Sequence, residues 1–289
     1  MGYSARYHAT SLIAVFLALA IGIVIGAALG GDTIDDTRRD LERSLTGNLE
    51  DARERAEDLS GELARANEFG DRVYPVLVGG QLRGERIGVV ALGGLPGDVA
   101  DSIEDAIVPA GGRLVGVGVV REPVDLQAFS DELTKTRFAD IVDDPDTQTA
   151  FAVGIGRQLV VGGTLLERVR SRLFSRASGN FGRLDAVVVV RDQPGDMGPL
   201  QRTAAGRLES GLVEGIAATR APAVGVESSD ADPSSISFFQ GNSLSSVDSI
   251  DLIAGRLATV LALLGAEGSF GVKGSADRLL PDLLSPRRP

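Results

Sequence analysis

Residues 12–29 form an unbroken apolar run, LIAVFLALAIGIVIGAAL, in a chain that carries a formal net charge of −11. At a rise of about 1.5 Å per residue the run measures roughly 27 Å, and its flanks between Ala9 and Gly31 extend it to match a hydrocarbon core of about 30 Å. A helix in a soluble core does not need to be apolar on every face. Residues 1–31 are therefore predicted to be a cytosolic head and a membrane-spanning signal-anchor helix.

A cleaved signal peptide is the alternative interpretation of this run. The apolar part of a signal peptide usually has about 7–15 residues, and here helix-forming sequence resumes at Asp32 without the loop that a cleavage site needs. Arg6 precedes the run while Arg38 and Arg39 follow it, so basic residues orient the helix only weakly. Similarity to uncleaved signal-anchors favours a single pass, with the N-terminus in the cytoplasm and the C-terminal domain outside.

Small residues recur at every fourth position of the predicted membrane helix. They are Ala14, Ala18, Gly22, Gly26 and Gly30. Such a stripe lets two helices approach closely in lipid, so the three glycines are candidates for packing against a second copy. Glycine and alanine are also common in membrane helices that do not associate, and this alternative stays open.

Residues 32–71 are dense in charge, lack proline, and are predicted to be helical over Asp32–Phe69. Apolar residues alternate at spacings of three and four, which is typical of a coiled coil. The predicted seam consists of Leu45, Leu49, Ala52, Ala56, Leu59, Leu63 and Ala66. With the small-residue stripe upstream, it predicts a parallel homodimer stalk. The alternative is a solvated helix that lies on its own globular domain.

The sequence pattern of residues 72–289 predicts an extracytoplasmic α/β domain. Four near-continuous apolar runs are predicted as strands: Arg86–Leu92, Leu114–Val120, Asp185–Val190 and Ala223–Glu227. Helices are predicted at Asp98–Pro109, Leu126–Arg137, Asp146–Phe174 in one or two pieces, Pro199–Ala218 and Val247–Leu264. Strands of this kind are buried on both faces, so the alternation predicts a predominantly parallel, doubly wound sheet covered by helices. The pattern does not determine the strand order.

The chain offers few groups for catalysis. It has no cysteine, and His8, ahead of the membrane run, is its only histidine. A thiolate nucleophile, a thiolate metal site and a Ser-His-Asp triad in the α/β domain are therefore excluded. The negative charge opposes binding to nucleic acid or to an anionic lipid surface. We expect no enzymatic activity, no cofactor and no nucleic-acid partner, although a nucleotide- or sugar-binding enzyme with a carboxylate pair assembled by folding stays open.

The strongest candidate for a ligand site is the loop that carries Glu227, Asp230 and Asp232. It follows a predicted parallel strand, and open α/β sheets bind ligands at the carboxyl ends of their strands. Acidic and hydroxyl side chains are also ordinary in loops, so a purely structural role is the alternative.

Three other polar segments are interpreted as structural. Residues 93–98, GGLPGD, occupy the place of a phosphate loop but lack its spacing and lysine, so Asp98 is predicted to cap a helix. Asp144 before Pro145 is predicted to be a helix cap rather than part of a hard-cation site. The serines within residues 243–246 are predicted to form the N-terminal cap region of the last long helix.

The two ends of the chain resemble a known family. Residues 6–33, RYHATSLIAVFLALAIGIVIGAALGGDT, and residues 247–281, which contain FGVKGSADRLLP from Phe270 to Pro281, are similar to the actinobacterial copper-transport protein B family of MctB-like proteins. The resemblance covers nearly the whole length. It implies a membrane-attached envelope protein of copper transport or homeostasis. It also implies, as the alternative function, septal cell-wall maintenance beside a partner membrane protein.

The residues themselves do not fit direct copper binding. Cu(I) prefers thiolate and thioether ligands and Cu(II) prefers imidazole, whereas Met197 is the only sulfur donor beyond the initiator. Nor do the strands alternate over about ten residues as a membrane β-barrel requires. We therefore expect no metal site, and a dimeric binding or scaffold module fits the sequence better than a channel.

Overall fold

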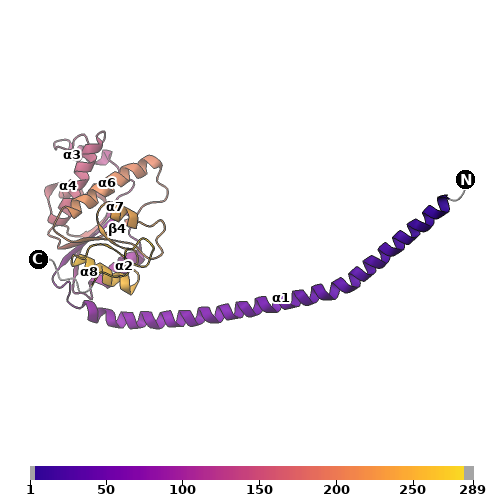
Figure 1. The fold of residues 1–289 in the computed structure, drawn as a ribbon. Helices are drawn as coiled ribbons and strands as arrows, with labels where there is room; N and C mark the ends of the chain where they lie inside the picture. The colour runs from indigo at the N-terminus through magenta and orange to yellow at the C-terminus, as the bar shows by residue number, and fades with distance from the viewer. Residues whose placement is uncertain (1–3, 283–289) are drawn as a thin grey trace. The chain divides into compact units, whose positions relative to one another are not determined.

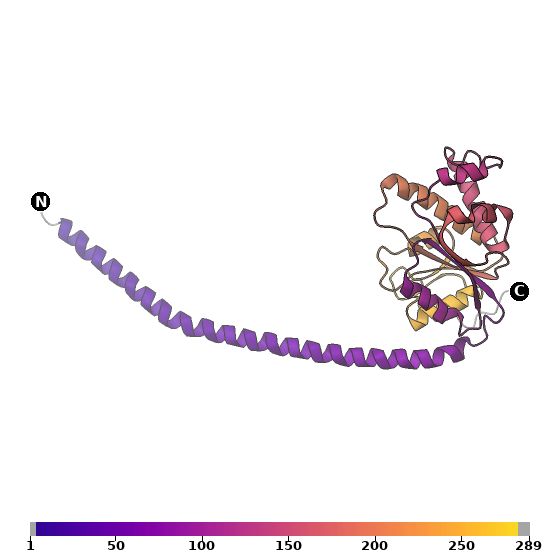
Figure 2. The same cartoon turned by 180° about the vertical axis from the view of Figure 1, so that it is seen from behind.

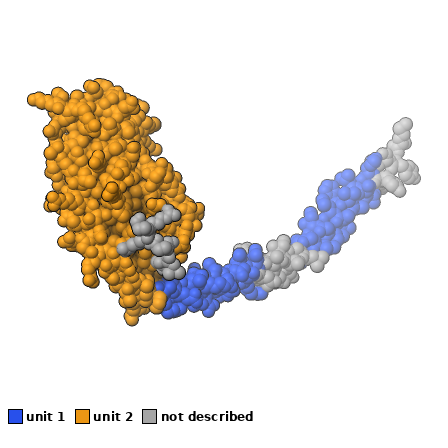
Figure 3. Space-filling model, turned by 60° about the vertical axis from the view of Figure 1, so that its left-hand side comes forward, with its two compact units in different colours: residues 1–66 blue, residues 67–289 orange. Residues whose placement is uncertain are grey.

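A computed structural model describes residues 4–282 (Figures 1 and 2). Its first element is a helix of 75 residues, α1 (Ser4–Val78), which is uninterrupted from the apolar run into the predicted stalk. The chain divides into two compact units, residues 1–66 and residues 67–289, coloured separately in Figure 3. The last turns of α1 thus belong to the same unit as the α/β fold.

The α/β fold contains seven strands and seven further helices within the described residues. In chain order they are β1 (Arg86–Gly93), α2 (Gly97–Ile107), β2 (Arg113–Val120), α3 (Gln127–Leu133), α4 (Pro145–Val161), α5 (Thr164–Leu173), β3 (Phe174–Gly179), β4 (Ala186–Asp192), α6 (Pro199–Ala217), β5 (Ala223–Val226), α7 (Ile236–Gly241), β6 (Ser245–Val247), α8 (Ile253–Leu263) and β7 (Ser269–Phe270).

The strands form one sheet in the order β3-β2-β1-β4-β5-β6-β7. Every neighbouring pair is parallel except β2 and β3, so an antiparallel strand lies at one edge. The order changes direction between β1 and β4, because β2 follows on one side of β1 and β4 on the other. A switch point of this kind opens a crevice at the carboxyl ends of the two strands.

Two hydrophobic cores lie on opposite faces of the sheet. Val187 and Val189 of β4 pack under α3, α4, α5 and α6, whereas Val188 and Val190 pack under α2, α8 and the end of α1. Figures 1 and 2 show the same division, with α3, α4 and α6 on one face and α2 and α8 on the other. Successive strand residues point to opposite faces, so a continuous valine run fills both cores.

Helices α4 and α6 pack unusually closely. A Cβ at Gly215 would collide with the carbonyl oxygen of Val153, and a Cβ at Gly156 would collide with the carbonyl oxygen of Leu212. Both obstacles are backbone atoms that a side-chain rotation cannot remove. Glycine at these two positions therefore sets the separation of the helices.

The structure confirms the predicted α/β class, with an N-terminal apolar helix, a long helix and a mostly parallel, helix-covered sheet. All four predicted strands are present within one or two residues of their expected limits. The long predicted segment Asp146–Phe174 consists of two helices, α4 and α5, which meet at 106°. Gly162 and Gly163 lie between them.

Several boundaries were wrong. The stalk helix does not end at Phe69 but continues through Pro75 to Val78, because Tyr74 and Val78 are buried in the domain core. The Tyr74 hydroxyl donates to the carbonyl of Ala106 over 2.9 Å, and burial raises the pKa of this phenol. Helix α3 covers only the first half of the predicted Leu126–Arg137.

The predicted start of the last long helix was also wrong. The last helix does not begin at Val247 as predicted: residues 245–247 form β6, and α8 begins only at Ile253. Ser245 and Ser246 are therefore strand residues rather than caps, and the Ser246 hydroxyl contacts the Ser269 hydroxyl at 2.9 Å inside the sheet. A three-residue strand with two serines has no hydrophobic periodicity to reveal it.

Candidate functional site

The described residues contain one helix that is long and apolar enough to cross a membrane, spanning His8–Ala28 with a mean hydropathy of 2.7. None of its most apolar window is buried inside the molecule. Positions Gly22 and Gly26 face open space, and the surroundings of Gly30 lie outside the described residues. This helix fits the predicted membrane anchor.

The predicted seam of the stalk is exposed to solvent. Leu45, Leu49, Leu59 and Leu63 retain between 51% and 64% of their accessible surface, and the three seam alanines are exposed as well. The exposed leucines are a surface that a second helix could bury. The structure describes a single copy, so the seam stays a prediction.

The three predicted ligand residues differ in burial. Glu227 is 4% exposed at the end of β5, whereas Asp230 and Asp232 are exposed in the following loop. The Asp230 carboxylate accepts a hydrogen bond from the Ser228 hydroxyl. Within the described residues the three carboxylates do not form a group that could hold a metal ion.

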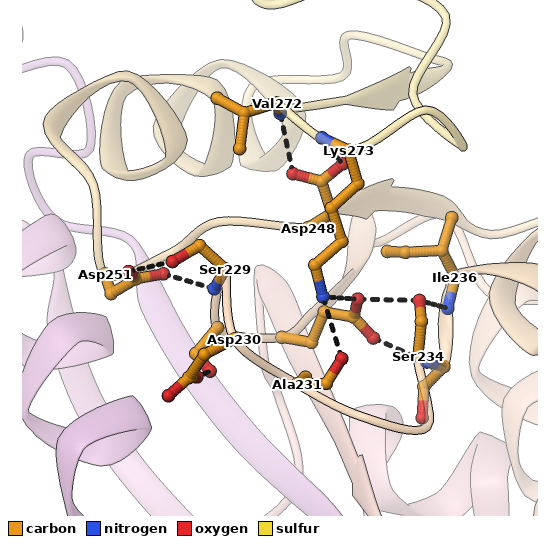
Figure 4. A network of polar contacts seen from close by, with 12 residues as sticks. Ser229, Asp230, Ala231, Ser234, Ile236, Asp248, Asp251, Val272 and Lys273 are labelled. Carbon is orange, nitrogen blue, oxygen red and sulfur yellow. Dashed lines mark hydrogen bonds and ion pairs between the residues drawn. The ribbon is translucent and has the colours of Figure 1, made fainter. Parts of the chain in front are cut away.

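Glu227 accepts three hydrogen bonds within a polar network, in which Figure 4 labels Lys273, Ser234 and Ala231. Its Oε1 accepts from Lys273 Nζ at 2.7 Å and from the Ser234 hydroxyl at 2.7 Å, and its Oε2 accepts from the backbone N–H of Ser235 at 2.5 Å. Lys273 Nζ also donates to the carbonyl of Ala231 at 3.1 Å. The lysine therefore compensates the buried charge and fastens the loop at the same time.

Asp248, at 0% exposure, fixes the backbone of the segment that contains Lys273. Its two carboxylate oxygens accept from the backbone N–H groups of Val272 at 2.8 Å and Lys273 at 2.9 Å. Asp251 similarly holds Ser229 through its N–H and its hydroxyl, each at 2.6 Å. The FGVK segment of the tail thus returns to the carboxyl edge of the sheet and closes it from the β7 side.

A second acidic cluster, which the sequence analysis missed, lies beside the β1/β4 switch point. Glu209 on α6 is 1% exposed and accepts both Nε and Nη2 of Arg191 at 3.1 Å, with Gln193 Nε2 at 3.0 Å. The carboxyl group of Glu122, just after β2, lies close enough to Glu209 for the charge of Glu209 to act on it. A buried carboxyl group beside a second acid is more easily kept neutral than charged.

Burial, together with the charge of Glu209, raises the pKa of Glu122 to about 8. Arg191 opposes this increase and Asp192 adds to it. Both Glu122 oxygens are buried and accept no hydrogen bond from a protein donor in the described residues. The cluster can therefore hold one proton near neutral pH. The sequence signal for this cluster was the presence of acids immediately after β2 and at the end of β4. Glu209, in the middle of a helix, gave no such signal.

The loops singled out in the sequence have structural roles. Asp144 caps α4, accepting from the N–H groups of Asp146 at 3.2 Å and Thr147 at 3.0 Å, and hydrogen bonds from Thr147 and Asp146 lower the pKa of Asp144. The prediction for Asp98 was wrong: Pro96 is the N-cap of α2, and Asp98 lies in its first turn without a capping bond.

Soft metal ligands are scarce. Met197, the predicted sole sulfur donor of the domain, is 3% exposed in the core. Over residues 4–282, no group of three or more histidine, cysteine or carboxylate side chains is arranged to hold a metal ion.

Comparison with known proteins matches the chain to a family model. No curated protein is similar enough to be matched. A family model described as "Copper transport outer membrane protein, MctB" matches residues 3–281, which includes the anchor, the long helix and the α/β fold up to the FGVK-containing tail. Because the match covers nearly the whole chain, the chain belongs to the MctB copper transport family.

Proposed function

We propose that this chain is a membrane-anchored, dimeric scaffold of the cell envelope that supports copper homeostasis through a partner rather than by binding copper. The uninterrupted helix α1 carries the proposal, because it joins an apolar span directly to the α/β fold. Residues 32–66 correspond to about 50 Å along a helix axis. A helix of this length is a spacer between a membrane and a domain.

The exposed leucines of the stalk support dimerisation. Four leucines that each retain more than half of their surface are costly to leave in water, since full burial of each stabilises by about 1.5–3 kcal/mol. Two copies anchored in one membrane with the same orientation bring their stalks together in parallel. The membrane also raises the local concentration of the helices, which compensates for the alanines in the seam.

The Glu227 network supports a role without catalysis at this loop. The Glu227 network is satisfied by Lys273, Ser234 and Ser235, and so it offers no free nucleophile or base. The one histidine, His8, is in the anchor segment. Copper tolerance would then depend on the partner that the domain holds in place.

Topology is the direct test of the tether. We expect membrane-extracted protein to keep its N-terminus, and protease added to spheroplasts to digest the α/β domain while the anchor stays with the membrane. A mature chain that begins near Asp32, or a domain protected from external protease, would refute this proposal.

A further inference from the structure

The two edges of the sheet differ in whether the chain covers them. At the β7 edge the chain turns back, and Gly271 and Asp277 donate backbone N–H groups to the carbonyls of Arg278 and Ser269. At the other edge, β3 is the last strand, and no strand in the described part of the chain pairs with its outer side. Residues 175–179 are all exposed. An exposed edge of this kind is a template for another strand.

The β3 edge is also basic in an acidic protein. Residues 164–184 hold five arginines and one acidic residue, Glu167, while the whole chain carries −11. The arginines are Arg168, Arg170, Arg172, Arg176 and Arg183. Arg172 and Arg176 are exposed, and neither forms an ion pair within the described residues. The local field at this edge therefore attracts an anionic partner.

Side chains hold the β3 edge in place at both ends, and a hollow lies beside it. Arg121 donates to the carbonyl of Phe174 at 3.2 Å and Arg170 to that of Gly179 at 2.7 Å, so both ends of β3 are fastened. A hollow of about 410 Å³ lies between α5 and β3, lined by Glu167, Arg170, Ser171, Phe174 and Ala177. The stacked rings of Phe174 and Phe181, 5.4 Å apart, support the strand from the core side.

We propose that the outer edge of β3 binds an extended acidic peptide segment of another protein, which joins the sheet as an eighth strand. Backbone pairing to β3 supplies the geometry, and carboxylates of the peptide pair with Arg172 and Arg176. A second copy of this chain is a poor occupant, because β3 against β3 would place Arg176 of each copy near like charge. A lipid surface would satisfy the arginines but not the strand backbone.

This inference goes beyond the proposed tether and does not depend on dimerisation of the stalk. The test uses the full chain in non-ionic detergent and two fluorescein-labelled peptides of equal charge, TETETETET and EPTEPTEPTE. The first can form a strand, whereas proline prevents the second from pairing. Fluorescence anisotropy measures binding, and hydrogen exchange measures protection of the amides in residues 175–179.

We expect TETETETET to bind at least tenfold more tightly than EPTEPTEPTE and to slow exchange in β3. Arg176→Glu should weaken this binding at least fivefold and Arg172→Glu/Arg176→Glu at least tenfold. Arg220→Glu, the charge-matched control, should have little effect, because β2, β1 and β4 separate β3 from β5, which Arg220 precedes. Equal binding of the two peptides, equal effects of the Arg176 and Arg220 variants, or unchanged exchange in β3 would each overturn the proposal.

Discussion

Lys273 Nζ lies 2.7 Å from Glu227 Oε1, and the two residues are 46 positions apart in the chain. Glu227 is 4% exposed and the lysine side chain 20% exposed, so the ion pair is largely shielded from water. Through this contact the FGVK segment neutralises the buried carboxylate of Glu227, which directly follows β5. One carboxylate of the predicted ligand site, that of Glu227, is therefore paired with the chain's own lysine.

Removing the lysine should destabilise the domain strongly. Lys273→Met leaves the Glu227 carboxylate buried without its cation, and we expect a loss of about 2–4 kcal/mol in the free energy of unfolding. Adding Glu227→Gln should recover part of that loss. Arg278→Met is the matched control, because the Arg278–Asp282 pair is exposed and should contribute less than about 1 kcal/mol. Urea denaturation measures all three, and equal losses for Lys273→Met and Arg278→Met would contradict the account.

The Glu122–Glu209 pair predicts a pH dependence of stability. Because the pKa of Glu122 is raised from 4.5 to about 8 in the folded state, the folded protein binds this proton more tightly than the unfolded chain does. Stability from this group is therefore complete below pH 4.5, falls as the pH rises, and reaches its minimum above pH 8. Glu122→Gln keeps the size of the side chain and replaces the titrating carboxyl group with a neutral amide.

We expect Glu122→Gln to match the wild type near pH 5 and to exceed it by about 1–2 kcal/mol at pH 9, after allowing for solvent screening of the partly exposed side chain. Denaturation of residues 67–289 at the two pH values is the measurement. Parallel pH profiles for the two proteins would show that Glu122 does not hold the proton.

The close packing of α4 and α6 predicts opposite effects for two glycines of one helix. Gly215→Ala places a methyl group against the Val153 carbonyl and should destabilise by about 1–3 kcal/mol. Gly206→Ala, with nothing near its Cβ position, should stabilise by up to about 1 kcal/mol. Thermal denaturation of both variants checks this, and a neutral Gly215→Ala would mean that the helices can separate without cost.

Copper provides a negative prediction. With Met197 buried and no cysteine or histidine beyond the anchor, we expect residues 67–289 to bind Cu(I) no more tightly than an ordinary acidic surface. Calorimetry with Cu(I) in the presence of a competing chelator tests this. Stoichiometric, submicromolar binding that survives Met197→Leu would reveal a site that the ligand inventory misses.

The parts of the fold that could be predicted were those with long apolar runs. Apolar runs such as residues 186–190 fill two cores at once, so both their secondary structure and the parallel class followed from the sequence. Strands β3, β6 and β7 could not be predicted. All of β3 after Phe174 is exposed, and β6 and β7 are too short to show a pattern. Their pairing partners come from elsewhere in the chain.

The candidate site was predictable only in position. Its place after β5 followed from the general behaviour of α/β sheets, and the structure does put Glu227 there. The partner Lys273 was not predictable, since nothing local to Glu227 or Lys273 specifies a contact over 46 residues. The Glu122–Glu209 pair was missed for the same reason, because it joins the end of β2 to the middle of α6.

Because the natural chain has no cysteine, a single introduced thiol reports directly on the central claim that the stalk is a parallel dimer. Leu59→Cys places the thiol in the predicted seam, and Glu54→Cys places it on the opposite side of the same helix as a matched control. In oxidised membranes containing the full chain, we expect Leu59→Cys to form a disulfide-linked dimer and Glu54→Cys to stay monomeric. Equal cross-linking of the two variants, or none of Leu59→Cys, would contradict the account.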